Sequence, residues 1–339
     1  MLKIQELDID GYDRVIHGYD ECFDAYIAVH NINLGVAIGG CRAIEYPTTD
    51  DALKDALSLA KGMTYKNAMA GLPNGGGKSV INGLPTEENL MKFAEMMNYI
   101  NEEGRIYMTG GDMNTGLKQL EFLNKYTEFV YCGGNTDSGQ ATAQGVYQAI
   151  KGAVKALGGD MNKQIYSILG YGKVGKRLSD FMVQDNLYHM VADVTPVNPE
   201  DYIPSIRGQA SVSNSHFAGN VWIPCAAGGA INDVTASSLP ENSLVCGGAN
   251  NQLAHPDIMR QLEARNVTYV PDYVANAGGV IIIAVRGTDN LDLEYNSPVV
   301  TEKLNKIGET VHDIVKESLE TGVSTDIIAN SMAERIFND

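Results

Sequence analysis

Two lysines and one aspartate stand in surroundings that are unusual for charged residues. Lys66 lies in MTYKNA and Lys78 in GGGKS, so both have small or apolar neighbours. A surface lysine normally lies among polar residues, and we therefore expect both side chains to point inward. Asp112 follows the apolar segment RIYMT, in the loop-like run GGDMNTG. The three could hold an anionic group and exchange protons with a small substrate. Solvated lysines and a turn-forming aspartate are the alternative.

A glycine motif has the spacing of a dinucleotide site. Gly170, Gly172 and Gly175 follow the apolar run QIYSIL and open a predicted helix, and Asp193 ends the next predicted strand. Such glycines let backbone N–H groups approach a pyrophosphate at a helix N-terminus. Asp193 would bind ribose hydroxyls and repel a 2′-phosphate, and no Arg or Lys occurs in the ten residues after it. The motif predicts NAD rather than NADP, with a glycine-rich turn beside a surface aspartate as the alternative.

The run GLPNGGGKS also invites interpretation as a phosphate-binding loop. The nucleoside-triphosphate pattern needs a glycine five residues before the glycine of its Gly-Lys pair. Leu72 occupies that position, and Gly71 lies one residue too early. Because the loop must direct its N–H groups at a phosphate, we disfavour an NTPase.

Composition narrows the class of protein. The chain has 339 residues, which predicts two domains, and a net charge of −17, which disfavours nucleic acid and anionic membranes as partners. The five cysteines include no C-x-x-C pair, and no H-E-x-x-H motif occurs, so we expect reduced thiols and no metal site. The N-terminus lacks the apolar core of a signal peptide, and no apolar run is long enough to span a bilayer. We expect a cytoplasmic protein.

The first third of the chain mixes strands, helices and glycine loops. A capping box of Thr48 and Asp51 predicts a helix that ends near Gly62. Residues 63–81 suggest a strand, a glycine loop and a second strand. A second helix is expected from Pro85 to Gly104. Further strands are predicted at 25–30, 36–38 and 105–109.

Strands and helices alternate regularly from about residue 139. One helix is expected at 141–157 and a second directly after the glycine motif. A helical tail is expected from about 302 to 337. The strands between them are predicted at 164–169, 189–194, 221–224, 243–246 and 267–270. This alternation predicts an α/β fold with a doubly wound parallel sheet.

The sequence resembles the glutamate/leucine/phenylalanine/valine dehydrogenases, with motifs closest to the leucine/phenylalanine branch. Over roughly residues 25–285 it carries several family motifs in the family's order: GGCRAIEYPTTDDALKDALSLAKGMTYKNAMAGLPNGGGKSVI, LGYGKVGKRL, WIPCAAGGAIND, CGGANNQL and YVPDYVANAGGVI. The resemblance implies two domains with an active-site cleft between them. Residues 1–138 would form the substrate-binding and oligomerisation domain, joined by the helices of 302–339, and 139–301 a Rossmann NAD-binding domain.

The resemblance also implies roles for matching residues. Lys66, together with Asn251, would hold the substrate α-carboxylate. Lys78, with its neutral form favoured by burial, would activate the water that adds to the imine. Asp112 would take and return protons at the amino nitrogen, and the carbonyl of Gly40 would accept a hydrogen bond from that nitrogen. The nucleotide contacts implied are Gly170, Gly172, Lys173, Val174, Gly175, Asp193, Thr142, Cys225, Ala226, Ala249 and Asn250.

The substrate side chain is expected to be apolar. In the glutamate branch, a lysine just before the GG-x-R motif binds the side-chain carboxylate, whereas here that position is Ile38. Gly110 removes a methyl group from the expected pocket wall, and Ala275 is small, so both would enlarge the pocket. This favours aromatic or large aliphatic substrates, unless the glycines before Asp112 serve only the turn.

Three departures from the family pattern leave the choice of amino acid open. Cys41 stands where the family often has threonine, the stretch between Asp193 and Trp222 is short, and the usual acidic pattern is missing after Gly279. The last departure concerns the far wall of the pocket.

Together these features predict NAD-dependent oxidative deamination of an apolar L-amino acid, such as phenylalanine, leucine or tryptophan, to a 2-oxo acid and ammonia. A non-catalytic NAD-binding module on the same scaffold is the alternative, although such a module need not keep Lys66, Lys78 and Asp112. The resemblance further implies a homo-oligomer, for which the strand at 25–30 is the expected pairing edge.

Overall fold

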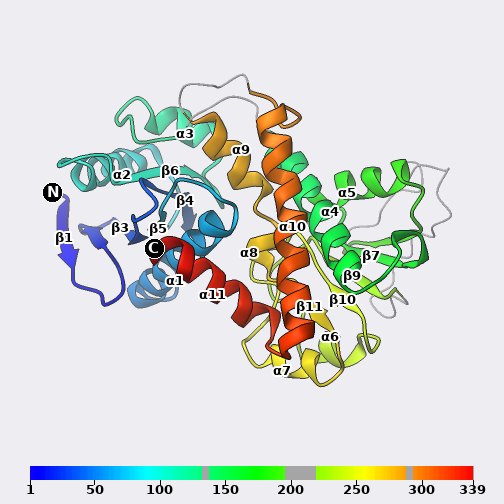
Figure 1. The fold of residues 1–339 in the computed structure, drawn as a ribbon. Coiled ribbons are helices and arrows are strands. Elements are labelled where there is room, and N and C mark those ends of the chain that lie inside the picture. The colour runs from blue at the N-terminus through cyan, green and yellow to red at the C-terminus, as the bar shows by residue number, and fades with distance from the viewer. Residues whose placement is uncertain (132–136, 195–218, 288–292, 339) are drawn as a thin grey trace. The chain divides into compact units, whose positions relative to one another are not determined.

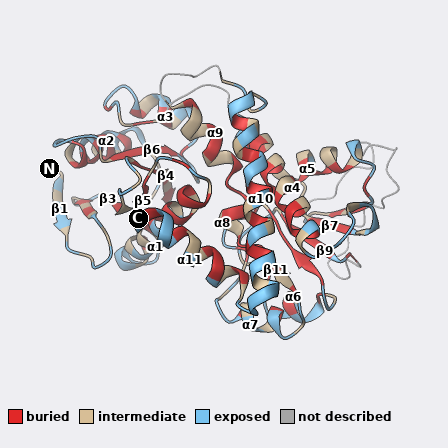
Figure 2. Ribbon diagram, in the orientation of Figure 1, coloured by how far each residue is buried: buried red, intermediate tan, exposed pale blue. Residues whose placement is uncertain are grey.

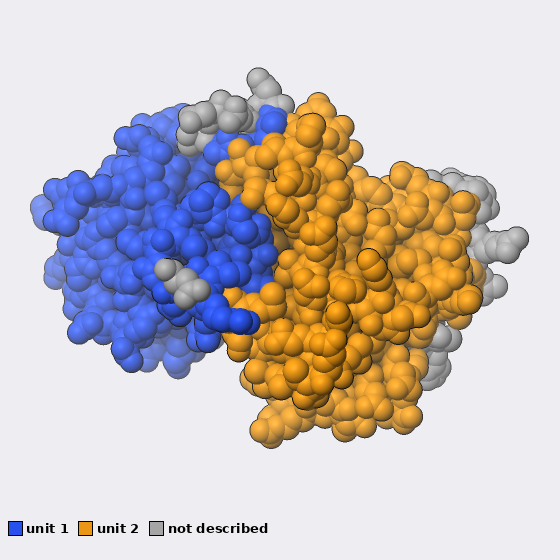
Figure 3. Space-filling view, in the orientation of Figure 1, with its two compact units in different colours: residues 1–135, 286–293, 333–339 blue, residues 136–285, 294–332 orange. Residues whose placement is uncertain are grey.

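The computed structural model describes residues 1–131, 137–194, 219–287 and 293–338. The chain divides into two compact units, which Figure 3 shows in separate colours. Unit 1 contains Met1–Asn135, Arg286–Leu293 and Ala333–Asp339, and unit 2 contains Thr136–Val285 and Glu294–Met332. The tail after residue 302 therefore groups with unit 2 as far as Met332, whereas the sequence prediction joins all of it to the first domain.

Unit 1 is built on a six-stranded sheet (Figure 1). Its strands are β1 (Lys3–Leu7), β2 (Arg14–Tyr19), β3 (Asp24–Asn31), β4 (Ala37–Ile44), β5 (Gly76–Asn82) and β6 (Tyr107–Gly111). They lie in the order β1-β2-β3-β5-β4-β6. β4 is parallel to β5 and β6, on either side of it, and the other pairs are antiparallel. The expected edge at 25–30 is wrong, because β3 pairs with β2 on one side and β5 on the other.

Three helices of unit 1 cover its sheet. They are α1 (Thr49–Met69), α2 (Glu87–Ile100) and α3 (Leu117–Leu123). Alanines of α1 pack with Val80 in one buried cluster, while α2 and α3 pack with the opposite face in another (Figure 2). The predicted helix starts are confirmed, since the Thr48 hydroxyl accepts a hydrogen bond from the Asp51 N–H at 3.1 Å and the Thr86 hydroxyl from the Asn89 N–H at 3.2 Å.

Helix α1 corrects one prediction. The helix passes Gly62 and continues to Met69, so the strand suggested at the start of 63–81 is wrong. A glycine inside a helix costs only about 1 kcal/mol relative to alanine. Burial of Thr64, Tyr65, Asn67, Ala68 and Met69 beyond it offsets that cost.

Unit 2 contains a five-stranded sheet in which every pair is parallel, in the order β11-β10-β9-β7-β8. The strands are β7 (Tyr166–Leu169), β8 (His189–Ala192), β9 (Val221–Pro224), β10 (Leu244–Val245) and β11 (Thr268–Tyr269). The helical elements are α4 (Ser138–Ala156), η1 (Met161–Lys163), α5 (Lys173–Gln184), α6 (Asp233–Ser238), α7 (Ile258–Glu263), α8 (Asp272–Ala275), α9 (Gly278–Arg286), α10 (Pro298–Thr321) and α11 (Thr325–Asn338). The last residue of α9 and the part of α11 from Ala333 onward belong to unit 1. The predicted α/β fold with a parallel sheet is confirmed.

The helices of unit 2 pack in two groups. α6 and α7 form a buried cluster with Trp222, Val245 and Tyr269 of the sheet, and α4 packs against α5 and α10. The predicted helical tail is interrupted at Gly322, whose φ of +72° ends α10. Most of the short stretch before Trp222, residues 195–218, lies outside the described residues. Among the helices that are described, none is both long and apolar enough to cross a bilayer.

Candidate active site

The register of β4, β5 and β6 gathers the predicted catalytic residues on one face of the unit 1 sheet. Cys41 pairs with Ser79, so Gly40 and Lys78 occupy neighbouring positions, and Gly40 pairs directly with Gly110. Alternate residues of a strand point to the same face. Val80 packs against α1, and Lys78, two residues earlier, therefore lies on the α1 side of the sheet.

Lys78 and Asp112 form a buried ion pair at this face. Lys78 Nζ donates to Oδ2 of Asp112, with the two side chains 8% and 22% exposed. The other oxygen, Oδ1, accepts the Met113 N–H at 2.8 Å. Lys78 thus points inward, as its glycine-rich neighbours predict. It lies inside strand β5 and not in a loop before a helix, which excludes the phosphate-loop alternative.

Charge, rather than solvent, determines the ionisation of Asp112. Burial raises the pKa of this carboxyl, but the nearby cations Lys78 and Arg42 and the Met113 N–H lower it by more. Its pKa therefore lies below the usual value for aspartate. At neutral pH the group is a carboxylate and can accept a proton.

The glycines of β4 allow this close arrangement. A Cβ on Gly39 would lie 1.8 Å from the carbonyl oxygen of Gly77, and a Cβ on Gly40 would lie 2.9 Å from Cβ of Asp112. Both contacts are impossible, so only glycine permits β4 to pass between the strand of Lys78 and the end of β6. Gly40 therefore lies directly beside Asp112.

Lys66 lies in the last turn of α1, half-buried. The same helix lies so close to β5 that a Cβ on Gly76 would be 2.1 Å from the Thr64 backbone nitrogen. Helix α1 and strand β5 therefore meet at Thr64 and Gly76. Each of these residues lies two positions before one of the lysines, Lys66 or Lys78. Of the predicted pocket residues in this unit, Ile38 is buried next to Gly76 and Met108, and Gly110 is buried on β6.

Arg42, to which the sequence patterns assigned no role, is a further polar group next to this pair. Arg42 Nε lies 3.5 Å from Asp112 Oδ2, and Arg42 Nη1 donates to Asp55 at 2.9 Å. The Tyr46 hydroxyl donates to the same Asp55 oxygen at 2.5 Å. A usable signal was present, since Arg42 follows Gly40 by two residues and must share its face of β4.

The predicted nucleotide turn lies in unit 2, between β7 and α5. Gly170 has a φ of +104°, and a Cβ on Gly175 would lie 1.9 Å from the Gly170 carbonyl oxygen. Gly172 instead has nothing within 4 Å of its Cβ position and lies at the N-cap of α5, without a side-chain cap. Lys173 and Val174 form the first turn of that helix. In this turn, Gly170 has a left-handed backbone, Gly172 borders open space, and Gly175 packs closely against Gly170.

The carboxyl ends of neighbouring strands surround this turn. Asp193, just after β8, accepts the Tyr171 N–H at 2.6 Å. After β9, the Cys225 N–H donates to the Leu169 carbonyl at 2.7 Å, and Ala226 N lies 2.6 Å from the Cβ position of Gly170. A buried Ala249 follows β10 and donates to the Pro224 carbonyl at 2.9 Å. Backbone groups at the carboxyl ends of the strands, together with one aspartate, are the groups that typically form a dinucleotide site.

The other predicted residues of unit 2 lie outside the turn at 170–175. Thr142, on α4, donates to the Ser138 carbonyl at 2.8 Å. Asn250 accepts a hydrogen bond from Asn276 at 2.8 Å, and Asn251 has a left-handed φ of +51°. Ala275 is fully buried at the end of α8.

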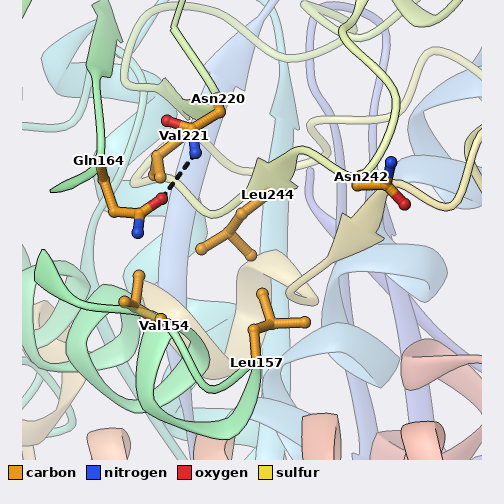
Figure 4. Close-up of a pocket in the computed structure, with 8 residues that line it drawn as sticks. Val154, Leu157, Gln164, Asn220, Val221, Asn242 and Leu244 are labelled. Atoms are coloured by element: carbon orange, nitrogen blue, oxygen red, sulfur yellow. Dashed lines mark hydrogen bonds between the residues drawn. The ribbon is translucent and has the colours of Figure 1, made fainter.

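A cavity of about 280 Å³ opens at the opposite, amino edge of the unit 2 sheet (Figure 4). Val154, Leu157 and Leu244 give it an apolar wall. Its polar side is a carboxamide pair, in which Asn220 Nδ2 donates to Gln164 Oε1 at 2.6 Å. None of its lining residues is charged, so it lacks the groups that the predicted chemistry needs.

Comparison with known sequences matches both units to one family. The sequence model of the Glu/Leu/Phe/Val dehydrogenase dimerisation domain matches residues 14–129, and that of the Glutamate/Leucine/Phenylalanine/Valine dehydrogenases matches residues 188–336. The chain belongs to the Glu/Leu/Phe/Val dehydrogenase family. The resemblance inferred from the sequence motifs is therefore confirmed.

Relatives within the Glu/Leu/Phe/Val dehydrogenases are similar along nearly the whole chain. A valine dehydrogenase of Streptomyces coelicolor is 35% identical over 97% of this chain and 93% of its own length. A phenylalanine dehydrogenase of Caldalkalibacillus thermarum is 35% identical over 91% and 86%. The crystal structure of L-tryptophan dehydrogenase from Nostoc punctiforme superposes with a TM-score of 0.82 at 29% identity, covering 97% and 96% of the two chains.

Proposed function

We propose that this member of the family catalyses the NAD-dependent oxidative deamination of an L-amino acid with a large apolar side chain. The observation that carries the proposal is the buried contact between Lys78 and Asp112 beside Gly40. Burying an ion pair brings little stability, so its presence at a glycine-lined face favours a chemical role. The alternative of a non-catalytic module has no support among the relatives described above.

In the proposed mechanism, the residues of unit 1 bind the two charged ends of the amino acid. Lys66 holds the α-carboxylate and so orients Cα. The Gly40 carbonyl accepts a hydrogen bond from the α-amino group, and Asp112 accepts a proton from it. The low pKa of Asp112 supports this step, because the group is ionised before substrate binds.

A nicotinamide dinucleotide held at the turn of unit 2, by the N-terminus of α5 and Asp193, would supply the acceptor for the hydride that leaves Cα. The resulting substrate iminium is attacked at Cα by water, from which the neutral amine of Lys78 removes a proton. Asp112 then returns its proton to the amino nitrogen of the carbinolamine. The C–N bond breaks, and the departing ammonia takes the hydroxyl proton and leaves as ammonium, which turns the hydroxyl into the carbonyl of the 2-oxo acid.

The turn of unit 2 supports a nicotinamide dinucleotide as the cofactor. The open space at Gly172 and the uncapped start of α5 leave room for a pyrophosphate at the helix N-terminus. Asp193, at the end of β8, favours ribose hydroxyls over a 2′-phosphate and therefore NAD over NADP.

Three features support a large apolar side chain in the substrate. Ile38 is buried and apolar, so a substrate carboxylate beside it would lose hydration without gaining a cation. The Cβ position of Gly110 has no atom closer than 4.0 Å, so the backbone does not require glycine there, whereas a Cβ on Gly111 would lie 2.8 Å from the Thr115 carbonyl oxygen. The relatives named above are valine, phenylalanine and tryptophan dehydrogenases.

A panel of amino acids assayed with NAD and with NADP tests the proposal. We expect NAD reduction, followed by the absorbance of NADH, with phenylalanine, leucine or tryptophan, and none with glutamate. No turnover with any amino acid, in either direction, would refute the proposed function. Turnover with NADP alone would refute only the role given to Asp193.

We also propose that the chain is a homo-oligomer assembled through unit 1. Residues 14–129 match a domain described as a dimerisation domain, which supports this assignment. Sedimentation of the full chain tests it, and a monomer at micromolar concentration would contradict it.

A further inference from the structure

Arg42 is a half-buried cation next to Asp112. Its side chain is 17% exposed and lies on the same face of β4 as Gly40. Arg42 Nη1 is bound to Asp55, whereas Nε is buried without a hydrogen-bond partner among the described residues and lies 3.5 Å from Asp112 Oδ2. The two groups are thus in ion-pair contact without a hydrogen bond between them.

Lys78 and Arg42 share one oxygen of Asp112 but differ in chemistry. Lys78 Nζ donates to Oδ2, the atom that Arg42 Nε also approaches. To activate water, Lys78 must be neutral, and a neutral amine no longer attracts the carboxylate. An arginine guanidinium stays charged at every working pH. Arg42 therefore remains as the cation beside Asp112 while Lys78 acts on the water molecule.

We propose that Arg42 is the positioning residue that keeps Asp112 oriented, and ionised whenever it must accept a proton, and that Asp55 and Tyr46 hold Arg42 in place. This inference rests on the function proposed above, because it assigns Arg42 to the proton transfers of that mechanism. Arg42 touches neither substrate nor water in it and acts only through Asp112.

Asp55 and Tyr46 form the support that this role requires. Asp55 Oδ2 accepts both the Arg42 guanidinium, at 2.9 Å, and the Tyr46 hydroxyl, at 2.5 Å. Asp55 belongs to α1, the helix that also carries Lys66, so one helix holds Arg42 and the proposed carboxylate ligand. The planar guanidinium bridges Asp55 and Asp112, which an ammonium group could not do with the same geometry.

Two further titratable groups near Asp112, the Cys41 thiol and the Tyr107 phenol, do not carry charge at neutral pH. Burial raises the pKa of the Cys41 thiol, on β4, to about 12. Burial likewise raises the pKa of the Tyr107 phenol, on β6, well above its usual value. Among the described residues, Lys78 and Arg42 form ion pairs with Asp112, and of these two only Lys78 is required to change its charge during the reaction.

Titration of the Asp112 carboxyl tests the inference without any need for turnover. The full-length protein is labelled with ¹³C at its aspartate carboxyls, and the Asp112→Asn variant identifies the resonance. In Arg42→Met we expect the titration midpoint of Asp112 to move to higher pH, while Arg42→Lys keeps it closer to the wild-type value. An unmoved midpoint in folded Arg42→Met would overturn the inference, even if the wild-type protein turned over no amino acid.

Kinetics distinguish positioning from a merely structural role. In Arg42→Met the acidic limb of the kcat/KM profile should move to higher pH, and kcat at the optimum should fall about ten- to hundred-fold, the range of one charged hydrogen bond. The KM for NAD should not change, and free guanidinium should restore part of the activity of Arg42→Ala. A uniform loss at every pH, without rescue, would count against the proposal.

Two further variants keep the test independent of folding. Arg105→Gln removes another guanidinium–carboxylate pair of unit 1, the exposed contact with Glu128 at 3.3 Å, and should leave the profile unchanged. Tyr46→Phe retains Arg42 but weakens its support, so kcat should fall several-fold with the KM for the amino acid nearly constant. Tyr46→Phe with wild-type kcat would overturn the supporting role of Tyr46 and Asp55.

Discussion

Both units use clusters of glycine, but for different purposes. In unit 1, Gly39 and Gly40 lie inside a strand and let neighbouring strands bring Lys78 and Asp112 together. In unit 2, Gly170 and Gly175 shape a turn whose product is a set of backbone N–H groups at the start of a helix. The first cluster thus organises reactive side chains, and the second organises a binding surface made mostly of backbone.

The difference determines how each site should fail. Unit 1 depends on individual charged groups, so loss of one side chain should abolish chemistry while leaving the fold intact. Unit 2 depends on backbone geometry. A methyl group added at Gly175 should therefore affect both NAD binding and folding, whereas one added at Gly172 should affect NAD binding alone.

Removal of the Lys78 amine should have the largest effect. In Lys78→Ala we expect a loss of kcat of about 10³-fold or more, the range of a general base, with NAD binding retained because the nucleotide turn lies in the other unit. Steady-state kinetics and titration of NADH fluorescence measure the two quantities. Lys54→Ala, an exposed lysine of α1, is the matched control. Substantial activity in Lys78→Ala would remove this residue from the mechanism.

Two alanine variants separate the glycines of the turn. Gly175→Ala places a Cβ 1.9 Å from the Gly170 carbonyl oxygen, so we expect loss of stability of about 1–3 kcal/mol together with weaker NAD binding. Gly172→Ala meets no atom within 4 Å, so it should weaken NAD binding without lowering the melting temperature. Equal behaviour of both variants in melting and binding would contradict the distinction.

A methyl group at Gly110 should change selectivity more than stability. The open space at its Cβ position predicts an unchanged melting temperature, while the ratio of kcat/KM for phenylalanine over valine should fall about ten-fold. Gly111→Ala, whose Cβ would lie 2.8 Å from the Thr115 carbonyl oxygen, should instead destabilise unit 1. A proportional loss for all substrates in Gly110→Ala would place residue 110 outside the pocket.

The smallest effect should be a pH dependence of stability in unit 2. His189 is fully buried between the Ser179 hydroxyl, at 2.7 Å, and the Leu187 carbonyl, at 3.1 Å, and burial lowers its pKa. Below pH 6.5, the ordinary value, the unfolded chain binds a proton that the folded state resists, so stability should fall as the pH drops from there towards the folded pKa.

Hydrogen exchange of β8 and β3 amides between pH 7.5 and 5.5 compares this effect between the units. Burial also lowers the pKa of His30 in unit 1. That side chain is only half-buried, so its protonation costs less folding free energy than that of His189. We expect protection to fall more in β8 than in β3. Equal losses would contradict the greater role given to His189.

The success of the sequence predictions follows the same division between the units. The turn at 170–175 was predictable because one contiguous run contains the strand end, the glycines and the helix start. The extent of α1 was not, because burial beyond Gly62 depends on a sheet that local sequence does not describe. The edge assigned to 25–30 failed for a similar reason, since β5, which arrives later in the chain, pairs with β3.

The glycine turn, the helix starts near Thr48 and Pro85, and the charged residues at 66, 78 and 112 could all be identified from local sequence. These depend on neighbours in the chain, whose effects are local. Tertiary structure alone decided that β4 lies between β5 and β6, and therefore that Arg42 reaches Asp112 across residues far apart in sequence. Pairing of strands that are distant in the chain depends on the packing of the whole sheet, which no short motif encodes.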